Sequence, residues 1–185
     1  MAGDLYTPRL HLRPLEPSDE DLYCRLYTDH RVMRHVAPPL SREAALRAFG
    51  LVLRRQVIEP PRSRCWILVS REGGDALGLM AWLPDPDEPG SAEVGVLLAA
   101  RAQGRGHATE AIAALADVVF AATAQRRLWT RHAPDNGLAA GLMRKLGFEP
   151  VPEAVDGPAP LRWQLEREHW SARRGTVFAA PPATC

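Results

Sequence analysis

The residues with the clearest chemical potential form a glycine-rich turn, Gln103-Gly-Arg-Gly-His-Ala108, between an apolar strand-like run and a long helical pattern. Glycines have no Cβ, so they let a ligand come close to the backbone. The first turn of a helix carries unpaired N–H groups and the positive end of the helix dipole. Together these features predict a cradle for a phosphate or diphosphate group. Arg105 adds a charge-assisted contact to such an anion.

Other glycine-rich phosphate motifs fit this turn less well. A Walker loop requires the pattern GxxxxGK[ST], which the sequence lacks. A Rossmann fingerprint requires GxGxxG, and Thr109 stands where its third glycine belongs. On these six residues alone, a plain strand-to-helix turn that binds nothing remains the alternative.

A carboxylate in the strand-like run before the turn is the second candidate. Glu93 precedes the apolar residues Val94 to Leu98. Burial disfavours the charged form of a carboxylate and makes it a stronger base, as general-base catalysis requires. The alternative is an exposed strand carboxylate that alternates with Val94.

The cysteines do not point to a metal site or a disulfide framework. Cys24, Cys65 and Cys185 are widely spaced, odd in number and without the CxxC or Cys/His spacing of metal ligands. We therefore expect no metal and a reducing, cytoplasmic setting, with Cys24 and Cys65 packed in the core.

The surrounding patterns predict an α/β (α+β) domain with a mixed sheet. Apolar residues with helical periodicity mark two early helices, a long helix opened by the glycine-rich turn, and a later helix capped by Asp135 or Asn136 and ended by Gly147. The apolar stripe of the second early helix ends at Val57, and that of the later helix runs through Leu138, Leu142 and Leu146. The early helices begin at Ser18 and Ser41, expected as N-caps. Strand-like runs cover 9–13, 65–69, 76–83, 91–99, 127–133, 148–151 and 161–165. Short turns join the second to fourth runs, which indicates antiparallel pairing.

Length and charge narrow the class of protein. A chain of 185 residues suggests one domain, which we place at 1–170, followed by a flexible tail at 171–185. The net charge of +1 argues against a nucleic-acid binder. No apolar run approaches the ~18 residues of a membrane-spanning helix, and the N-terminus has no apolar core of a signal peptide.

Four markers, in order, resemble the GNAT superfamily of acyl-CoA N-acyltransferases, in particular its ribosomal-protein N-acetyltransferase branch (RimJ/RimL-like). The glycine-rich turn resembles the family's Q/R-x-x-G-x-G/A diphosphate motif. Thr7-Pro-Arg-Leu-His-Leu-Arg-Pro14 resembles the branch's opening strand, and Ala92-Glu-Val-Gly95 its fourth-strand motif. Asn136 with Lys145-Leu-Gly-Phe148 resembles its closing motif. The resemblance spans about residues 7 to 167.

The resemblance implies a fold and a ligand. The fold is a mixed, mostly antiparallel sheet, splayed between its fourth and fifth strands and flanked by about four helices, and acetyl-CoA lies in the gap as co-substrate. The implied contacts with acetyl-CoA come from Val94, Val96, Leu97, Leu98, Gln103, Gly104, Arg105, Gly106, His107, Ala108, Thr109, Asn136 and Lys145. Asn136 has the alternative of a helix cap alone, and Lys145 that of a solvated charge.

The resemblance also implies a reaction, transfer of an acetyl group from acetyl-CoA to a primary amine by direct attack in a ternary complex, with Glu93 as base. The acceptor is a small-molecule amine or a protein N-terminus, and a homodimer is possible. Three side chains depart from the family: Met143 replaces a tyrosine, Ala139 a serine and Val96 a tyrosine. These departures keep an alternative open, an acyl-CoA-binding sensor or interaction module with little turnover.

Overall fold

The computed structural model describes residues 3–58, 63–152 and 160–177. Within these residues eight strands form one sheet in the order β1-β2-β3-β4-β5-β6-β8-β7. Neighbouring strands are antiparallel except for β5 and β6, which are parallel. The strands are β1 (Leu5–Tyr6), β2 (Leu10–Pro14), β3 (Arg64–Ser70), β4 (Ala76–Pro84), β5 (Ser91–Leu98), β6 (Arg127–His132), β7 (Glu149–Pro150) and β8 (Leu161–Glu166). The mixed, mostly antiparallel sheet that we predicted is thus confirmed.

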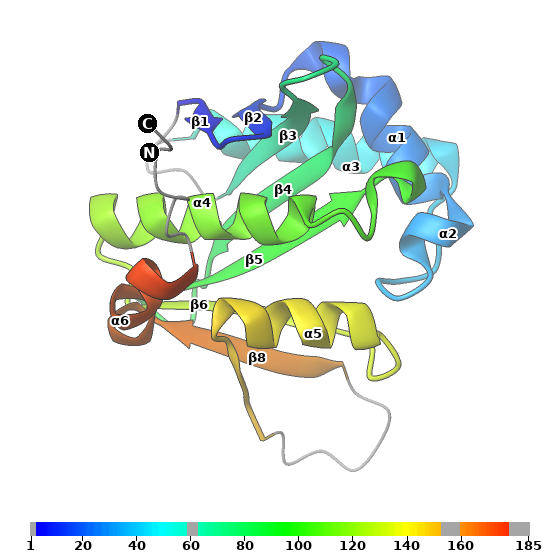
Figure 1. Cartoon of the computed structure of the whole chain (residues 1–185). Coiled ribbons are helices and arrows are strands. Elements are labelled where there is room, and N and C mark those ends of the chain that lie inside the picture. Colours follow the sequence, from blue (N-terminus) through cyan, green and yellow to red (C-terminus); the bar gives the residue numbers. More distant parts are fainter. Residues whose placement is uncertain (1–2, 59–62, 153–159, 178–185) are drawn as a thin grey trace.

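Helices cover both faces of this sheet (Figure 1). They are α1 (Glu20–Thr28), α2 (His30–Met33), α3 (Arg42–Gln56), α4 (His107–Ala122), α5 (Gly137–Leu146) and α6 (Arg167–Val177). One core cluster joins α4 and α5 to even-numbered β5 residues such as Val94 and Leu98, and the other joins α1 and α3 to Leu97. Because side chains alternate along a strand, Glu93 and Gly95 belong to the same face as Leu97.

The sheet opens between β5 and β6. These strands pair only where Ser91, Ala92 and Glu93 lie opposite Arg127, Leu128 and Trp129. Beyond Glu93, β5 continues to Leu98 with β4 as its neighbour on one side. A parallel pair requires a crossover connection, and α4 provides it by crossing one face of the sheet (Figure 1). The gap therefore opens beside the beginning of α4, where the sequence predicted an anion site.

Local hydrogen bonding explains which caps were predicted correctly. The Ser41 hydroxyl accepts from the Ala44 N–H, and the Asn136 side chain accepts from the Ala139 N–H, both at 3.1 Å. Gly147 ends α5 with φ 84°. Ser18 was wrong as a cap, because Pro17–Asp19 forms a 3₁₀ turn and Asp19 binds the Glu16 N–H with its own carboxylate.

The structure corrects three further expectations. Val57 is 80% exposed because α3 ends at Gln56, one residue before it. Leu138, expected on the buried stripe of α5, is 79% exposed. Leu146 is buried as the stripe predicts, and Met143, which lies off that stripe, is buried too. The segment from 171 is helical as far as Val177, where we expected a tail, and the remainder of that tail lies outside the described residues.

The short elements β1 and α2 and the eleven-residue helix α6 were not predicted. In the described part of the chain, no helix is both long and apolar enough to cross a membrane.

Candidate functional site

A pocket of about 370 Å³ lies between the C-terminal half of β5, the beginning of α4 and one side of α5. The turn after α2 borders it with His35 and Val36. From the predicted site, the pocket is lined by Val96, Leu97, Leu98, Gln103, Gly104, Gly106, His107, Ala108, Thr109, Asn136 and Lys145. Residues that the sequence placed far apart thus meet at one cavity.

The glycine-rich turn and the first turn of α4 form one wall of this pocket. Gly104 and Gly106 have φ of 72° and 80°, in the left-handed region that favours glycine. Gly106 caps α4, and in the described residues no side chain caps that helix end. The amides of His107, Ala108 and Thr109 therefore lack intrahelical acceptors. Since a Cβ added at Gly104 would have no atom within 4 Å, a ligand can approach this turn closely.

Two side chains of the glycine-rich turn fold back onto the protein. The Gln103 Nε2 donates to the Leu98 carbonyl at 3.0 Å. The His107 Nδ1 donates to the Ala102 carbonyl at 3.2 Å. The first bond holds the turn against the end of β5, and the second holds it against the 3₁₀ turn Ala100–Ala102. We therefore assign both residues to the shape of the turn and to its backbone.

A network of charged side chains supports the glycine-rich turn, and it was not predicted from the sequence. The Glu110 carboxylate accepts hydrogen bonds from the Thr7 hydroxyl, from the Arg9 N–H at 2.8 Å and from the Arg9 Nε at 2.6 Å. Arg9 also donates from Nη1 to the Arg105 carbonyl at 2.9 Å. Burial alone would raise the pKa of Glu110, but the hydrogen bonds from Thr7 and Arg9 outweigh it and lower this pKa below its ordinary value.

The opposite wall belongs to α5. Asn136 caps this helix with its side-chain oxygen Oδ1 and also lines the pocket. A role as helix cap and a contact with acetyl-CoA are therefore compatible. Lys145, in the last turn, is exposed and borders the same cavity. The exposed Leu138 lines the pocket as well, which gives its apolar side chain a place other than the core.

Two predicted cofactor residues lie outside the lining. Val94 is buried in the core at 1% exposure, which leaves its backbone as the part that can contact a ligand. Arg105 is exposed and does not border the pocket, and its carbonyl is bound by Arg9. The turn therefore presents the backbone of its glycines to the pocket, with Arg105 on its outer side.

Glu93 lies where β5 and β6 separate, on the face that α1 and α3 partly cover. Its side chain is 26% exposed, and its Oε1 lies 3.3 Å from the Nε of Arg131. The Arg131 guanidinium also lies over the Trp129 ring, 5.7 Å from its centroid. Glu93 is thus a half-buried carboxylate paired with a more exposed arginine at the edge of the gap.

The described residues contain no group of three or more His, Cys, Asp or Glu side chains that could hold a metal ion. Cys24 and Cys65 are buried and free. Burial raises the pKa of both thiols, that of Cys65 to about 12. Both cysteines lie in the core, as predicted.

Comparison with known proteins explains the arrangement. A sequence profile of the acetyltransferase (GNAT) domain matches residues 9–149, which is most of the chain. The chain belongs to the GNAT acetyltransferase family. A curated relative, the uncharacterized N-acetyltransferase p20 of Bacillus licheniformis, is 28% identical over 146 residues, which make up 78% of this chain and 82% of the relative.

Solved structures share the fold of this GNAT protein. An acetyltransferase from Agrobacterium tumefaciens superposes with a TM-score of 0.76 at 25% identity, over 90% of this chain and 95% of that one. A spermidine N-acetyltransferase from Vibrio cholerae, in complex with CoA and spermine, superposes with a TM-score of 0.74 at 18% identity, over 89% of this chain and 99% of that one. RimL, a ribosomal-protein α-N-acetyltransferase in complex with CoA, superposes with a TM-score of 0.74 at 15% identity, over 88% of this chain and 97% of that one. GNAT neighbours thus bind CoA, and acetyl-CoA is the typical co-substrate of the family.

Proposed function

We propose that this GNAT protein transfers an acetyl group from acetyl-CoA to a primary amine by direct attack in a ternary complex. The observation that carries the proposal is a pocket that adjoins the gap between β5 and β6. One wall of this pocket is the N-terminus of α4, which no side chain of the described residues caps. Unpaired helix N–H groups favour anions, and CoA carries a diphosphate. The acceptor is a small-molecule amine or a protein N-terminus, and the named substrates of the spermidine and ribosomal-protein enzymes, both amines, support this class.

The pocket suggests how each part of acetyl-CoA is held. The diphosphate meets the amides between Gly104 and Thr109. The pantetheine arm runs along Val94 to Leu98, where none of the described strands pairs with β5 on the side of β6. Asn136 and Lys145 contact it from α5, Lys145 near a phosphate.

The position of Glu93 supports its role as general base. It belongs to the sheet face opposite α4 and α5, so an amine that enters from the α1 side meets Glu93 before the thioester. The amine nitrogen bonds to the thioester carbonyl carbon, the C–S bond breaks, and the proton of the amine passes through water to Glu93. An α-amine of pKa ~8 costs only about 1 kcal/mol to deprotonate at pH 7, so a modest base suffices.

Besides a base for the amine, the transfer requires a hydrogen-bond donor for the oxyanion that forms on the thioester carbonyl, and a proton for the thiolate that leaves. Of the two candidate donors, the backbone N–H groups of Val96 and Leu97, we propose that of Val96, because preorganised amides stabilise an oxyanion well. The Ala99 N–H donates to the Leu77 carbonyl beside β4, so by the alternation of an antiparallel ladder the Leu97 N–H also faces β4 and the Val96 N–H faces the gap. Met143 is buried in the core and Ala139 lines the pocket, and neither has a proton to give. We therefore assign protonation of the thiolate to water. The buried thiols of Cys24 and Cys65 fit a cytoplasmic location.

The test combines ligand binding with thiol release over a panel of amines and N-terminal peptides. Glu93→Gln should lower kcat by about 10²–10⁴ and leave the Kd for CoA unchanged. The matched control is Glu166→Gln, because Glu166 is also a half-buried strand carboxylate paired with an arginine, Arg127. This control should keep full activity. Tight CoA binding without thiol release on any acceptor would contradict the enzyme and favour an acyl-CoA sensor.

A further inference from the structure

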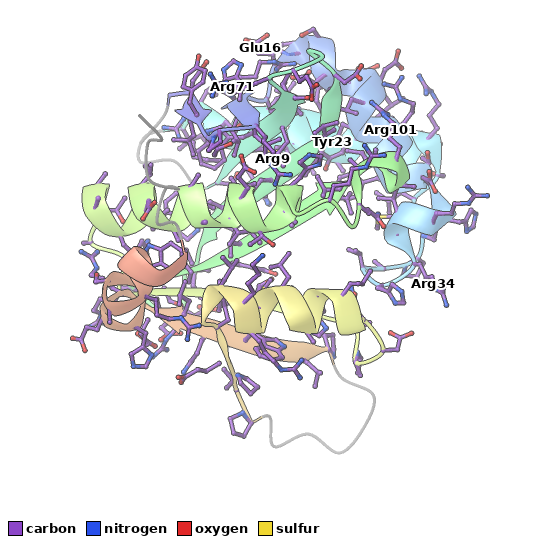
Figure 2. The ribbon with its side chains drawn as sticks, viewed as in Figure 1. Arg9, Glu16, Tyr23, Arg34, Arg71 and Arg101 are labelled. Carbon is purple, nitrogen blue, oxygen red and sulfur yellow. The ribbon has the colours of Figure 1, made fainter. Side chains whose placement is uncertain are left out.

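The turn between β1 and β2 contacts the glycine-rich turn from the side away from the pocket. Arg9 is the residue that connects them, and Figure 2 shows it beside α4. Its Nη1 donates to the Arg105 carbonyl at 2.9 Å, and its Nε donates to Glu110 at 2.6 Å. Gly104 and Gly106 border the pocket, whereas Arg9 does not. Any effect of Arg9 on a ligand in the pocket therefore passes through the backbone of the turn.

The geometry of a peptide group indicates what that effect is. In a trans peptide the carbonyl and the following N–H point in opposite directions. Arg9 holds the Arg105 carbonyl on its own side, so the Gly106 N–H points away from Arg9, and Gly106 lines the pocket on its other side. We propose that Arg9 is a positioning residue that fixes the Arg105–Gly106 peptide, so that its N–H faces the diphosphate of acetyl-CoA. This inference rests on the proposed function.

Glu110 in turn fixes Arg9. Its carboxylate binds both the backbone N–H and the Nε of Arg9, and it also accepts from the Thr7 hydroxyl. Glu110 lies in the first turn of α4, where a negative charge is favourable for the helix but repels an anionic ligand. The guanidinium of Arg9 balances that charge. One arginine thus orients an amide and neutralises the acid beside it.

Gly106 fits this arrangement for a steric reason. A Cβ at this position would lie 3.3 Å from the Arg9 Nη2, and φ is already 80°. The guanidinium therefore packs directly against the Gly106 backbone, and a side chain there would require it to shift by a few tenths of an ångström. This close contact is what a positioning role requires.

The experiment compares ligands with and without the diphosphate. Kd values for CoA, dephospho-CoA and pantetheine are measured by calorimetry for the wild type and for Arg9→Gln. We expect about tenfold weaker binding of CoA and dephospho-CoA, the effect of one misplaced hydrogen bond to a charged group. Pantetheine has no diphosphate, so its affinity should stay within about twofold. Arg9→Lys keeps the charge but lacks the planar fork, and it should lose affinity as Arg9→Gln does.

Arg71 offers a matched control. Its Nη1 donates to the Thr7 carbonyl at 2.7 Å, in the same β1–β2 turn, and Figure 2 shows it farther from α4 than Arg9. Arg71→Gln should leave all three Kd values unchanged. Glu110→Gln should weaken CoA binding, and in the double variant with Arg9→Gln it should add no further loss, because Glu110 acts through Arg9.

The outcomes separate this inference from the proposed function. If the wild type binds CoA and Arg9→Gln binds it equally well, the positioning role is wrong. The same holds if pantetheine loses as much affinity as CoA, or if Arg9→Lys keeps wild-type affinity. If the wild type binds none of the three ligands, the proposed function fails, and the role of Arg9 fails with it.

Discussion

Replacing Gly104 by alanine should weaken CoA binding, while the same replacement at Gly74 should not. The two glycines have nearly the same φ, 72° at Gly104 and 71° at Gly74. At neither position would an added Cβ have an atom within 4 Å. They differ in location, since Gly104 lines the pocket and Gly74 lies in the turn between β3 and β4. The pair therefore separates backbone strain from loss of a binding surface.

The two variants should lose the same free energy of unfolding. A left-handed alanine costs about 1–2 kcal/mol, and the stiffer unfolded chain offsets about 0.4–1 kcal/mol of this. We expect each variant to lose about 1 kcal/mol of unfolding free energy, which corresponds to a Tm lower by about 2–4 °C.

The difference should emerge when CoA is added. A ligand at 100 times its Kd stabilises a protein by about 2.7 kcal/mol. If the methyl group at residue 104 weakens diphosphate binding tenfold, the same CoA concentration gives about 1.4 kcal/mol. Gly74→Ala should retain the full increment. Urea unfolding with and without CoA measures both values, and equal increments in the two variants would refute the diphosphate site at Gly104.

Three further predictions address the surrounding elements. Asn136→Ala and Ser41→Ala each remove a helix cap, so each should cost about 1 kcal/mol of unfolding free energy, but only Asn136→Ala should also raise the Kd for CoA in calorimetry. The pKa of Glu110 is lowered in the fold, so its stabilising contribution is present above its ordinary pKa of 4.5 and is lost as the pH falls through the lower folded value. Urea unfolding between pH 2 and 7 should therefore show a smaller acid-induced loss of stability in Glu110→Gln, and an unchanged acid profile would contradict the network. Leu115 is fully buried in α4, and Leu115→Ala should cost about 2–5 kcal/mol in the same assay.

Features fixed by local chemistry could be predicted from the sequence. Ser41, Asn136 and Gly147 act within a few residues of their own position, so their types indicated the helix ends. The apolar runs between Cys65 and Ala99, and the short turns that join them, likewise indicated antiparallel pairing.

Features that depend on tertiary structure could not be predicted from the sequence. The periodicity of α5 fits a stripe through Leu138 as well as one through Met143, and the position of the gap decides which of them is buried. The network around Glu110 joins residues about a hundred positions apart, and no spacing reveals such a contact. The Thr7 to Pro14 segment did match a family pattern, but the pattern does not say that Arg9 reaches across to α4.

The opening between β5 and β6 has a consequence for the cooperativity of the molecule. Adjacent strands normally unfold together because a continuous ladder of hydrogen bonds links them, and here the ladder is interrupted after three residue pairs. A ligand whose amide groups bond to the free edge of β5, as the pantetheine arm of acetyl-CoA would, acts as a short extra strand and joins the two halves of the sheet. Amide hydrogens in β6 and β8 would then exchange more slowly with solvent, although they lie beyond the reach of the ligand. The substrate would in this way complete the sheet that binds it.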